Sequence, residues 1–145
     1  MIKEKQTMAK LCINSRDELR LVDLQEVAYL KASGCYTDFH FVSGKVRTEA
    51  QCLSAFEEAI NSLYTGTTNP FIRIGRSHLV NTGLVSSISI TKEQLTFLSD
   101  GLHPLFLSRR LLRKLKEQMI DSYGVGLRKN PASSERNIDD SERKP

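Results

Sequence analysis

Short runs of β-prone residues, separated by polar turn formers, occupy most of the chain and constrain its fold more than any other feature. The runs cover residues 10–13, 19–22, 27–30, 37–42, 71–74, 84–90, 95–98 and 102–107. Runs of this length, bounded by turn residues, are typical of strands. Because 145 residues leave room for one core, the sequence predicts a mainly β fold in a single domain.

In two stretches the apolar residues recur every three or four positions instead, which predicts two short helices. The stripe of the first helix consists of Ala50, Leu53, Phe56, Ile60 and Leu63. Thr48 and Gln51 match a capping box at its start, and Phe56 is expected in the core. A second helix follows Ser108, which can cap its amino terminus.

The remaining segments are expected to be connections and ends. Residues 31–37 predict a loop whose tip faces a ligand, and Ser99-Asp100-Gly101 predicts a hairpin. Residues 1–9 are expected to form an amino-terminal extension and residues 10–120 the folded domain. The composition of residues 121–145, rich in Gly, Pro, Ser and charge, predicts a disordered carboxyl-terminal tail.

Several classes of protein are excluded by what the sequence lacks. Apolar runs are far shorter than the roughly 20 residues that cross a bilayer, and no signal peptide is present, so a cytoplasmic protein is expected. Cys12, Cys35 and Cys52 are too widely spaced for a zinc site or a dense disulfide framework, and we expect buried or idle thiols. The histidines form no metal-binding pair, so no metal is expected.

No pattern predicts an enzyme or a cofactor. Gly124-Val125-Gly126 follows a predicted helix rather than joining a strand to a helix, which disfavours a dinucleotide loop. Ser77 and His78 are neighbours that would point to opposite faces of a strand. We therefore expect neither catalytic residues nor a bound cofactor.

Positive charge is concentrated in one part of the chain. Residues 71–116 contain eight lysines and arginines but only two acidic residues, Glu93 and Asp100, whereas the flanking segments are nearly neutral. Such asymmetry attracts nucleic acid or another anionic surface. Charge alone fits a solvated basic face equally well.

Two blocks in this basic segment resemble the LytTR family of bacterial DNA-binding domains. The first block carries Phe71, Arg73, Arg76, Ser77, Val80 and Asn81, and the second carries Ser108, Arg109 and Arg110. Upstream, Val27-Ala28-Tyr29-Leu30, Tyr36 and the helix after Thr48 also fit, so the resemblance covers residues 10–118. One departure is Gly75, which stands where the family most often has histidine.

The resemblance implies an elongated β fold whose loops enter successive major grooves of double-stranded DNA. It also implies a transcription regulator that stands alone, because the chain is too short for the receiver domain of many members. Paired direct repeats are the expected target, and a homodimer on DNA or a regulatory protein partner remains open.

The resemblance also directs attention to particular DNA-binding residues. We expect Arg110 to read a base, since arginine can donate twice to guanine. Arg76 and Ser77 are expected on the DNA backbone, and Ser108 and Arg109 at a phosphate beside the start of the second helix. Thr37 is expected to read a second groove.

Other residues of the blocks, and other functions, have competing interpretations. Arg73 fits a structural ion pair as well as DNA contact, and Asn81 and His78 fit turn bonding better than DNA contact. A protein-interaction module with a basic face is the main alternative function. RNA binding is disfavoured because Phe71 and Phe106 are expected to face inward and the chain has no Trp.

Overall fold

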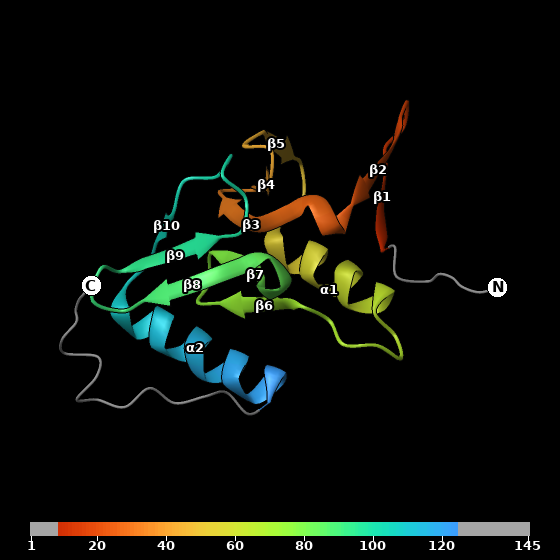
Figure 1. The fold of residues 1–145 in the computed structure, drawn as a ribbon. Coiled ribbons are helices and arrows are strands. Elements are labelled where there is room, and N and C mark those ends of the chain that lie inside the picture. Colours follow the sequence, from red (N-terminus) through yellow and green to blue (C-terminus); the bar gives the residue numbers. More distant parts are fainter. Residues whose placement is uncertain (1–8, 125–145) are drawn as a thin grey trace, which may run out of the picture.

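Three antiparallel sheets and two helices make up residues 9–124, which are the residues that the computed structural model describes (Figure 1). The strands are β1 (Lys10–Asn14), β2 (Leu19–Asp23), β3 (Val27–Ser33), β4 (Tyr36–Phe41), β5 (Val46–Glu49), β6 (Phe71–Ile74), β7 (His78–Asn81), β8 (Val85–Ser89), β9 (Gln94–Phe97) and β10 (Leu105–Phe106). The helices are α1 (Leu53–Leu63) and α2 (Arg109–Tyr123), and 3-10 turns at Leu24–Glu26 and Thr82–Leu84 precede β3 and β8. The predicted mainly β fold with two helices is confirmed.

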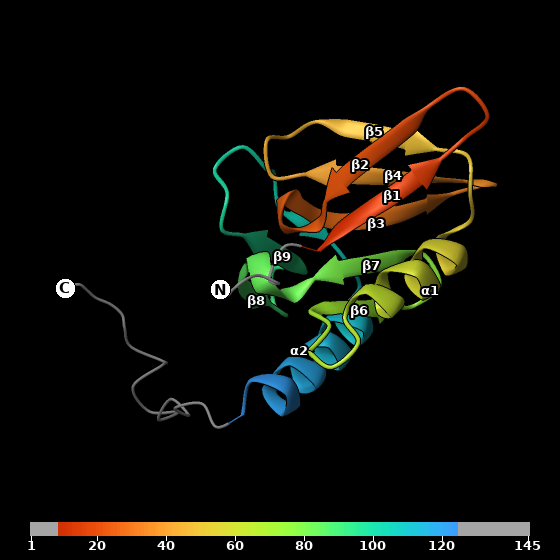
Figure 2. The same ribbon diagram turned by 90° about the vertical axis from the view of Figure 1, so that its right-hand side faces the viewer.

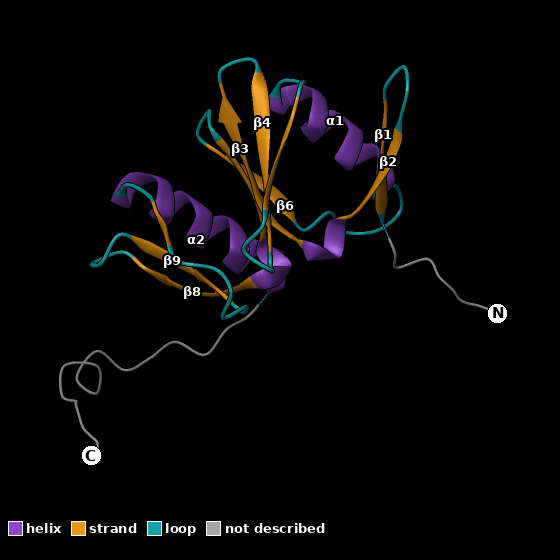
Figure 3. Cartoon of the chain, turned by 90° about the horizontal axis from the view of Figure 1, so that it is seen from above, coloured by secondary structure: helices purple, strands orange, loops and turns teal. Residues whose placement is uncertain are grey.

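The largest sheet has five strands in the order β5-β4-β3-β7-β6, which Figure 2 shows one below another. Its central strand, β3, is buried from Val27 to Leu30 without alternation, as expected of a strand covered on both faces. Figure 3 shows the two covering layers: α1 and the β1–β2 hairpin lie on one face, and α2 with the β10-β9-β8 sheet lies on the other.

Each face of the central sheet has its own hydrophobic core. The first core, under α1 and the β1–β2 hairpin, contains Leu11, Val22, Leu24, Val27, Leu30, Phe39, Leu53, Phe56, Ile60, Phe71 and Leu79. The second, under α2 and the small sheet, contains Ala28, Tyr29, Ile74, Val80, Leu95, Phe97, Leu107, Leu112 and Leu115. The core position predicted for Phe56 is therefore confirmed, and β3 contributes to both cores.

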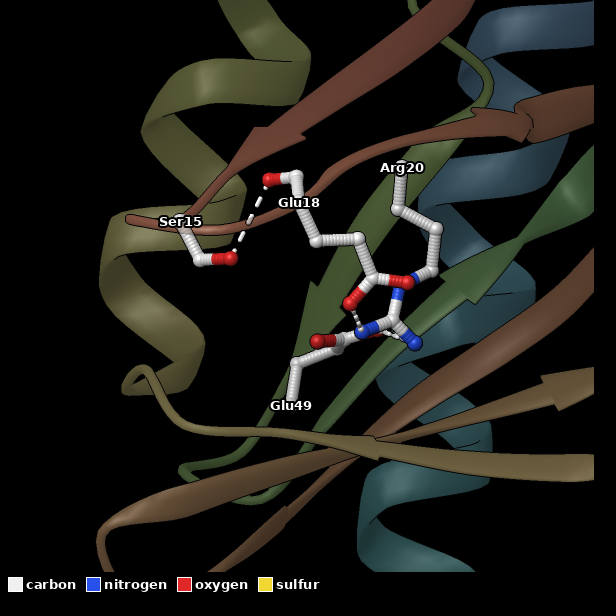
Figure 4. Close-up of polar contacts among 4 residues, drawn as sticks. All are labelled: Ser15, Glu18, Arg20 and Glu49. Carbon is white, nitrogen blue, oxygen red and sulfur yellow. Dashed lines mark hydrogen bonds and ion pairs between the residues drawn. The ribbon is translucent and has the colours of Figure 1, made fainter.

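An ion pair attaches the β1–β2 hairpin to the end of β5 (Figure 4). Arg20 on β2 lies between Glu18, at 3.1 Å, and Glu49, at 3.6 Å. The Glu49 carboxylate is buried, so the arginine supplies the positive charge that makes its burial tolerable. The Ser15 hydroxyl donates to the Glu18 carbonyl and closes the hairpin turn.

The first helix begins later than the capping-box pattern predicts. Thr48 lies in β5, where its hydroxyl donates to the Asp38 carboxylate at 2.6 Å. The helix starts at Leu53 after Cys52, which makes no side-chain cap. Pairing with β4 uses the residues that a purely local pattern assigned to the helix, so Ala50 is exposed and outside the stripe.

The connection between β9 and β10 is a long loop rather than the tight hairpin predicted at Ser99-Asp100-Gly101. The Ser99 hydroxyl donates to the Val42 carbonyl, and a Cβ on Gly101 would lie 3.0 Å from the same oxygen. The loop therefore docks on the β4–β5 turn, and a glycine permits that close approach.

The predicted domain limits are only partly covered by the described residues. Helix α2 continues to Tyr123, three residues past the predicted boundary at 120. Residues 1–8 and 125–145, which include most of the predicted extension and tail, lie outside the described residues.

Candidate nucleic-acid interface

The two basic blocks meet where the β6–β7 turn touches the start of α2. Gly75 in this turn has a φ of 60°, a conformation that favours glycine. A Cβ at this position would lie 3.3 Å from the Leu111 side chain. The absence of a side chain at Gly75 therefore lets the turn that carries Arg76 and Ser77 pack against the first turn of α2.

The β3–β4 turn lies beside the β6–β7 turn. Strands β3 and β7 pair with Lys31 opposite His78, and beyond that pair the Ala32 amide donates to the Ser77 carbonyl at 2.8 Å. The tip of the β3–β4 hairpin, residues 33–36, is thus held at the same end of the sheet as Arg76.

The β8–β9 turn also lies beside the start of α2. The Leu107 amide donates to the Glu93 carbonyl at 3.2 Å. The Arg109 guanidinium pairs with the Glu93 carboxylate at 3.4 Å, and both side chains are exposed. These contacts place residues 91–93 next to residues 108–110.

We call these four segments, residues 33–36, 75–77, 91–93 and 108–110, the basic edge. The arrowheads of β3, β6 and β8 all point to the left of Figure 1, where α2 also begins. Exposed basic side chains on the edge are Arg76, Lys92, Arg109 and Arg110. The edge therefore collects cationic groups from turns far apart in sequence, with Glu93 as its one carboxylate within these four segments.

Ser108 caps the amino terminus of helix α2, as the sequence predicts. The Ser108 hydroxyl accepts a hydrogen bond from the Leu111 amide at 3.3 Å. The first amides of a helix have no partner within it and carry the positive end of the dipole. This end of α2 is exposed and carries Arg109 and Arg110. Such an arrangement suits an anion such as a phosphate.

Arg73 and Asn81 have structural roles, as one interpretation of each predicted. Arg73 is ion-paired to Glu57 and donates to the Arg76 carbonyl at 3.0 Å. Its hydrogen bond to the Arg76 carbonyl therefore stabilises the β6–β7 turn within the same hairpin. The Asn81 side chain is buried, donates to the carbonyls of Leu24 and Val27, and accepts from the Gly83 amide at 3.0 Å.

The buried position of Thr37 does not fit the DNA-reading role that the sequence predicts for its side chain. Thr37 is 0% exposed, and its hydroxyl donates to the Gln51 carbonyl at 2.8 Å. The register explains this, because Thr37 lies opposite Glu49, where the chain leaves β5 towards α1. Within this hairpin the exposed residues are Lys31 and residues 33–36, including the Tyr36 ring.

The inward orientation expected of Phe106 is also wrong, and the residue was missed as a candidate. Phe106 is 65% exposed on β10, whereas Leu107 beside it is buried. Alternate residues of a strand point to opposite faces, so the inward leucines turn Phe106 outward. That alternation was the signal in the sequence that would have found it.

Two histidines near the basic edge contribute no positive charge at neutral pH. The His40 ring stacks on Tyr29 at 4.2 Å, and the His78 ring lies tilted against Tyr29 rather than in a turn bond. Burial, with Lys31 and His40 nearby, lowers the pKa of His78 to about 4. Burial also lowers the pKa of His40. The charge of the edge therefore comes from lysine and arginine.

The lowered pKa of His78 predicts that acid destabilises the fold. In the unfolded chain the imidazole gains a proton below about pH 6.5, whereas the folded ring stays neutral to about pH 4. Stability should be unaffected above pH 6.5 and fall by about 1–3 kcal/mol towards pH 4, a range that allows for solvent screening. Urea unfolding across this interval measures the loss.

The His78→Gln variant should lose part of that pH dependence, and His103→Gln, at an exposed histidine, should retain all of it. Identical pH profiles for the wild type and His78→Gln would contradict the assignment.

Residues 9–124 contain neither a metal-binding cluster nor a membrane-spanning helix. No cluster of three or more His, Cys, Asp or Glu could hold a metal ion there, and no described helix is long and apolar enough to cross a membrane. Cys12, Cys35 and Cys52 are free thiols, and all three are exposed rather than buried.

Comparison with known proteins identifies the family. The model of the LytTr DNA-binding domain matches residues 17–120, which include the whole basic edge. A similar solved structure is the LytTr DNA-binding domain of a methyl-accepting/DNA response regulator from Bacillus cereus, with a TM-score of 0.53 and 20% identity over 77% of this chain and 96% of that chain. That likeness shows a shared fold, and no curated protein sequence matches significantly. The family match over most of the chain establishes that the protein belongs to the LytTR family of DNA-binding domains, which bind DNA in transcription regulation.

Proposed function

We propose that the protein is a sequence-specific transcription regulator that inserts turns of the basic edge into successive major grooves. The observation that carries this proposal is the collection of three turns and the start of α2, with four exposed basic side chains, at one end of the molecule. Turns that project from a packed sheet reach base edges, whereas cationic side chains beside them neutralise phosphates.

Arg110 is the residue that reads a base in this proposal. Its side chain is exposed in the first turn of α2. Arg109 beside it is already paired with Glu93, which leaves Arg110 as the better candidate for two parallel hydrogen bonds to guanine O6 and N7.

The DNA backbone is held on either side of Arg110. Arg76 and Ser77, both exposed in the β6–β7 turn, bind phosphates near the centre of the site. The start of α2 after Ser108, together with Arg109, binds another phosphate. These contacts set the position of the protein on the duplex without selecting its sequence.

A second groove is contacted by the tip of the β3–β4 hairpin. Ser33 and Tyr36 are exposed there and supply hydroxyls that can donate or accept. Paired direct repeats are the expected target, so two protomers would occupy one site as a homodimer on DNA. A regulatory protein partner would supply the input signal.

Selection of bound duplexes from a random DNA pool at two salt concentrations tests the function. Recovery of a motif, with two short elements about one helical turn apart, would support the proposal. Binding without a motif that weakens uniformly with salt would reflect counterion release alone and favour the protein-interaction module.

Alkylation of the exposed cysteines locates the interface independently. Cys35 lies at the tip of the β3–β4 hairpin on the basic edge, whereas Cys12 lies on the β1–β2 hairpin on the other side of the sheet. The selected duplex should slow maleimide labelling of Cys35 several-fold and leave Cys12 unchanged, as measured by mass spectrometry of peptides. Equal protection of both thiols, or none at Cys35, would remove this turn from the interface.

A further inference from the structure

Phe106 is an exposed aromatic residue that the fold does not use. It exposes 65% of its surface, and therefore forgoes most of the hydrophobic stabilisation that a phenylalanine gains in a core. Strand β10 is fixed by its pairing with β9 and by the burial of Leu107. The outward direction of Phe106 is consequently set by the strand and not by a flexible loop.

Phe106 lies at the end of the small sheet that belongs to the basic edge. It pairs with Gln94 across β9, and Gln94 follows Glu93, the residue that contacts both Leu107 and Arg109. Two residues after Phe106 the chain reaches the cap of α2. A duplex that contacts Arg109 and Arg110 therefore passes close to the phenyl ring.

The chemistry of the ring limits what it can recognise on DNA. A phenyl group makes no hydrogen bond to phosphate or to the donors and acceptors of base edges. In the major groove the apolar group that bases present is the C5 methyl of thymine, and phenylalanine is among the side chains that contact it. The surrounding arginines favour a polyanion over an apolar protein partner at this position.

We infer that Phe106 is a specificity-determining residue that contacts a thymine methyl in the major groove next to the base read by Arg110. This inference rests on the proposed function and adds a preference for thymine to the arginine contact. It explains the exposure of the Phe106 ring by a contact with DNA.

Replacing single thymines by deoxyuridine tests the contact, because this change removes the methyl and nothing else. The probe is the duplex recovered from the random pool, bound by the full chain. For the wild type, deoxyuridine at one position should weaken binding about fourfold, the effect of one methyl-sized group buried. Phe106→Ala should bind the thymine duplex more weakly and lose its sensitivity at that position only.

Two variants control for folding and for general loss of apolar surface. Phe106→Leu keeps an apolar side chain and should retain part of the sensitivity. Leu98→Ala removes a residue of similar exposure, 63%, at the opposite end of β9, and should behave as the wild type. Circular dichroism confirms that each variant is folded.

The outcomes separate this inference from the proposed function. A recovered motif in which Phe106→Ala weakens thymine and deoxyuridine duplexes equally overturns the inference alone. So does a loss of self-association in Phe106→Ala, measured by sedimentation, without a change in deoxyuridine sensitivity, since the ring would then contact protein. Failure of the wild type to select any motif overturns the proposed function and the inference with it.

Discussion

Replacing Arg110 with alanine is expected to weaken binding to the selected site by about 1–3 kcal/mol, roughly 5- to 150-fold, and to relax the sequence preference at one position. The arginine is exposed in the first turn of α2, next to the exposed amino terminus of that helix. In the proposed complex its loss removes two hydrogen bonds to one base and leaves the contacts with the DNA backbone in place. Affinity for the selected site and for random DNA, each measured by fluorescence anisotropy at fixed salt, checks this.

The control for Arg110→Ala is Arg16→Ala, which removes the same charge from the exposed turn between β1 and β2, on the face of the sheet opposite α2. This variant should lower affinity for both DNAs slightly and equally, because it changes only the net charge. If Arg110→Ala also weakens both DNAs equally, Arg110 binds phosphate and does not read a base.

The Asn81→Ala variant is expected to lose about 2–4 kcal/mol of unfolding free energy. The asparagine amide donates to the carbonyls of Leu24 and Val27 and accepts from the Gly83 amide, and its side chain is buried. Alanine would leave these three backbone groups without that partner, and an unsatisfied buried group costs about 1–3 kcal/mol. Urea unfolding followed by circular dichroism measures the change.

Asn14→Ala, on an exposed position of β1, should leave the urea midpoint nearly unchanged. DNA affinity of folded Asn81→Ala, measured well below its unfolding midpoint, should equal that of the wild type. A variant that keeps full stability but loses DNA affinity would assign Asn81 to the interface.

The sequence predicts well those features that neighbouring residues determine. Ser108 caps α2 as expected, because a cap depends on amides only three residues away. Phe56 lies in the core because its stripe recurs with the helical period. Thr48 shows the limit of this reasoning: its spacing to Gln51 fits a cap, but pairing with the distant strand β4 determines its conformation.

The site is less predictable, because it is built from turns that meet only in three dimensions. The resemblance supplied Arg76 and Arg110, but nothing local indicates that Gly75 packs on Leu111 or that Arg109 pairs with Glu93. Thr37 was misassigned because burial there depends on the register of β4 against β5. Phe106 was misassigned although the flanking leucines already implied its outward direction.

The contact between Gly75 and Leu111 has a mechanical consequence for target choice. It places the turn that carries Arg76 so close to the helix that carries Arg110 that a Cβ added to Gly75 would lie 3.3 Å from the Leu111 side chain. The backbone segments that carry the two arginines are therefore packed against each other, and we expect their separation to change little when DNA binds. A duplex with an extra base pair between the two contact points shifts one of them by about 3.4 Å along the axis and turns it around the helix. The two packed segments would have to separate to follow that change. A change in the spacing of the target site should therefore weaken binding far more than substitutions between the contacted bases.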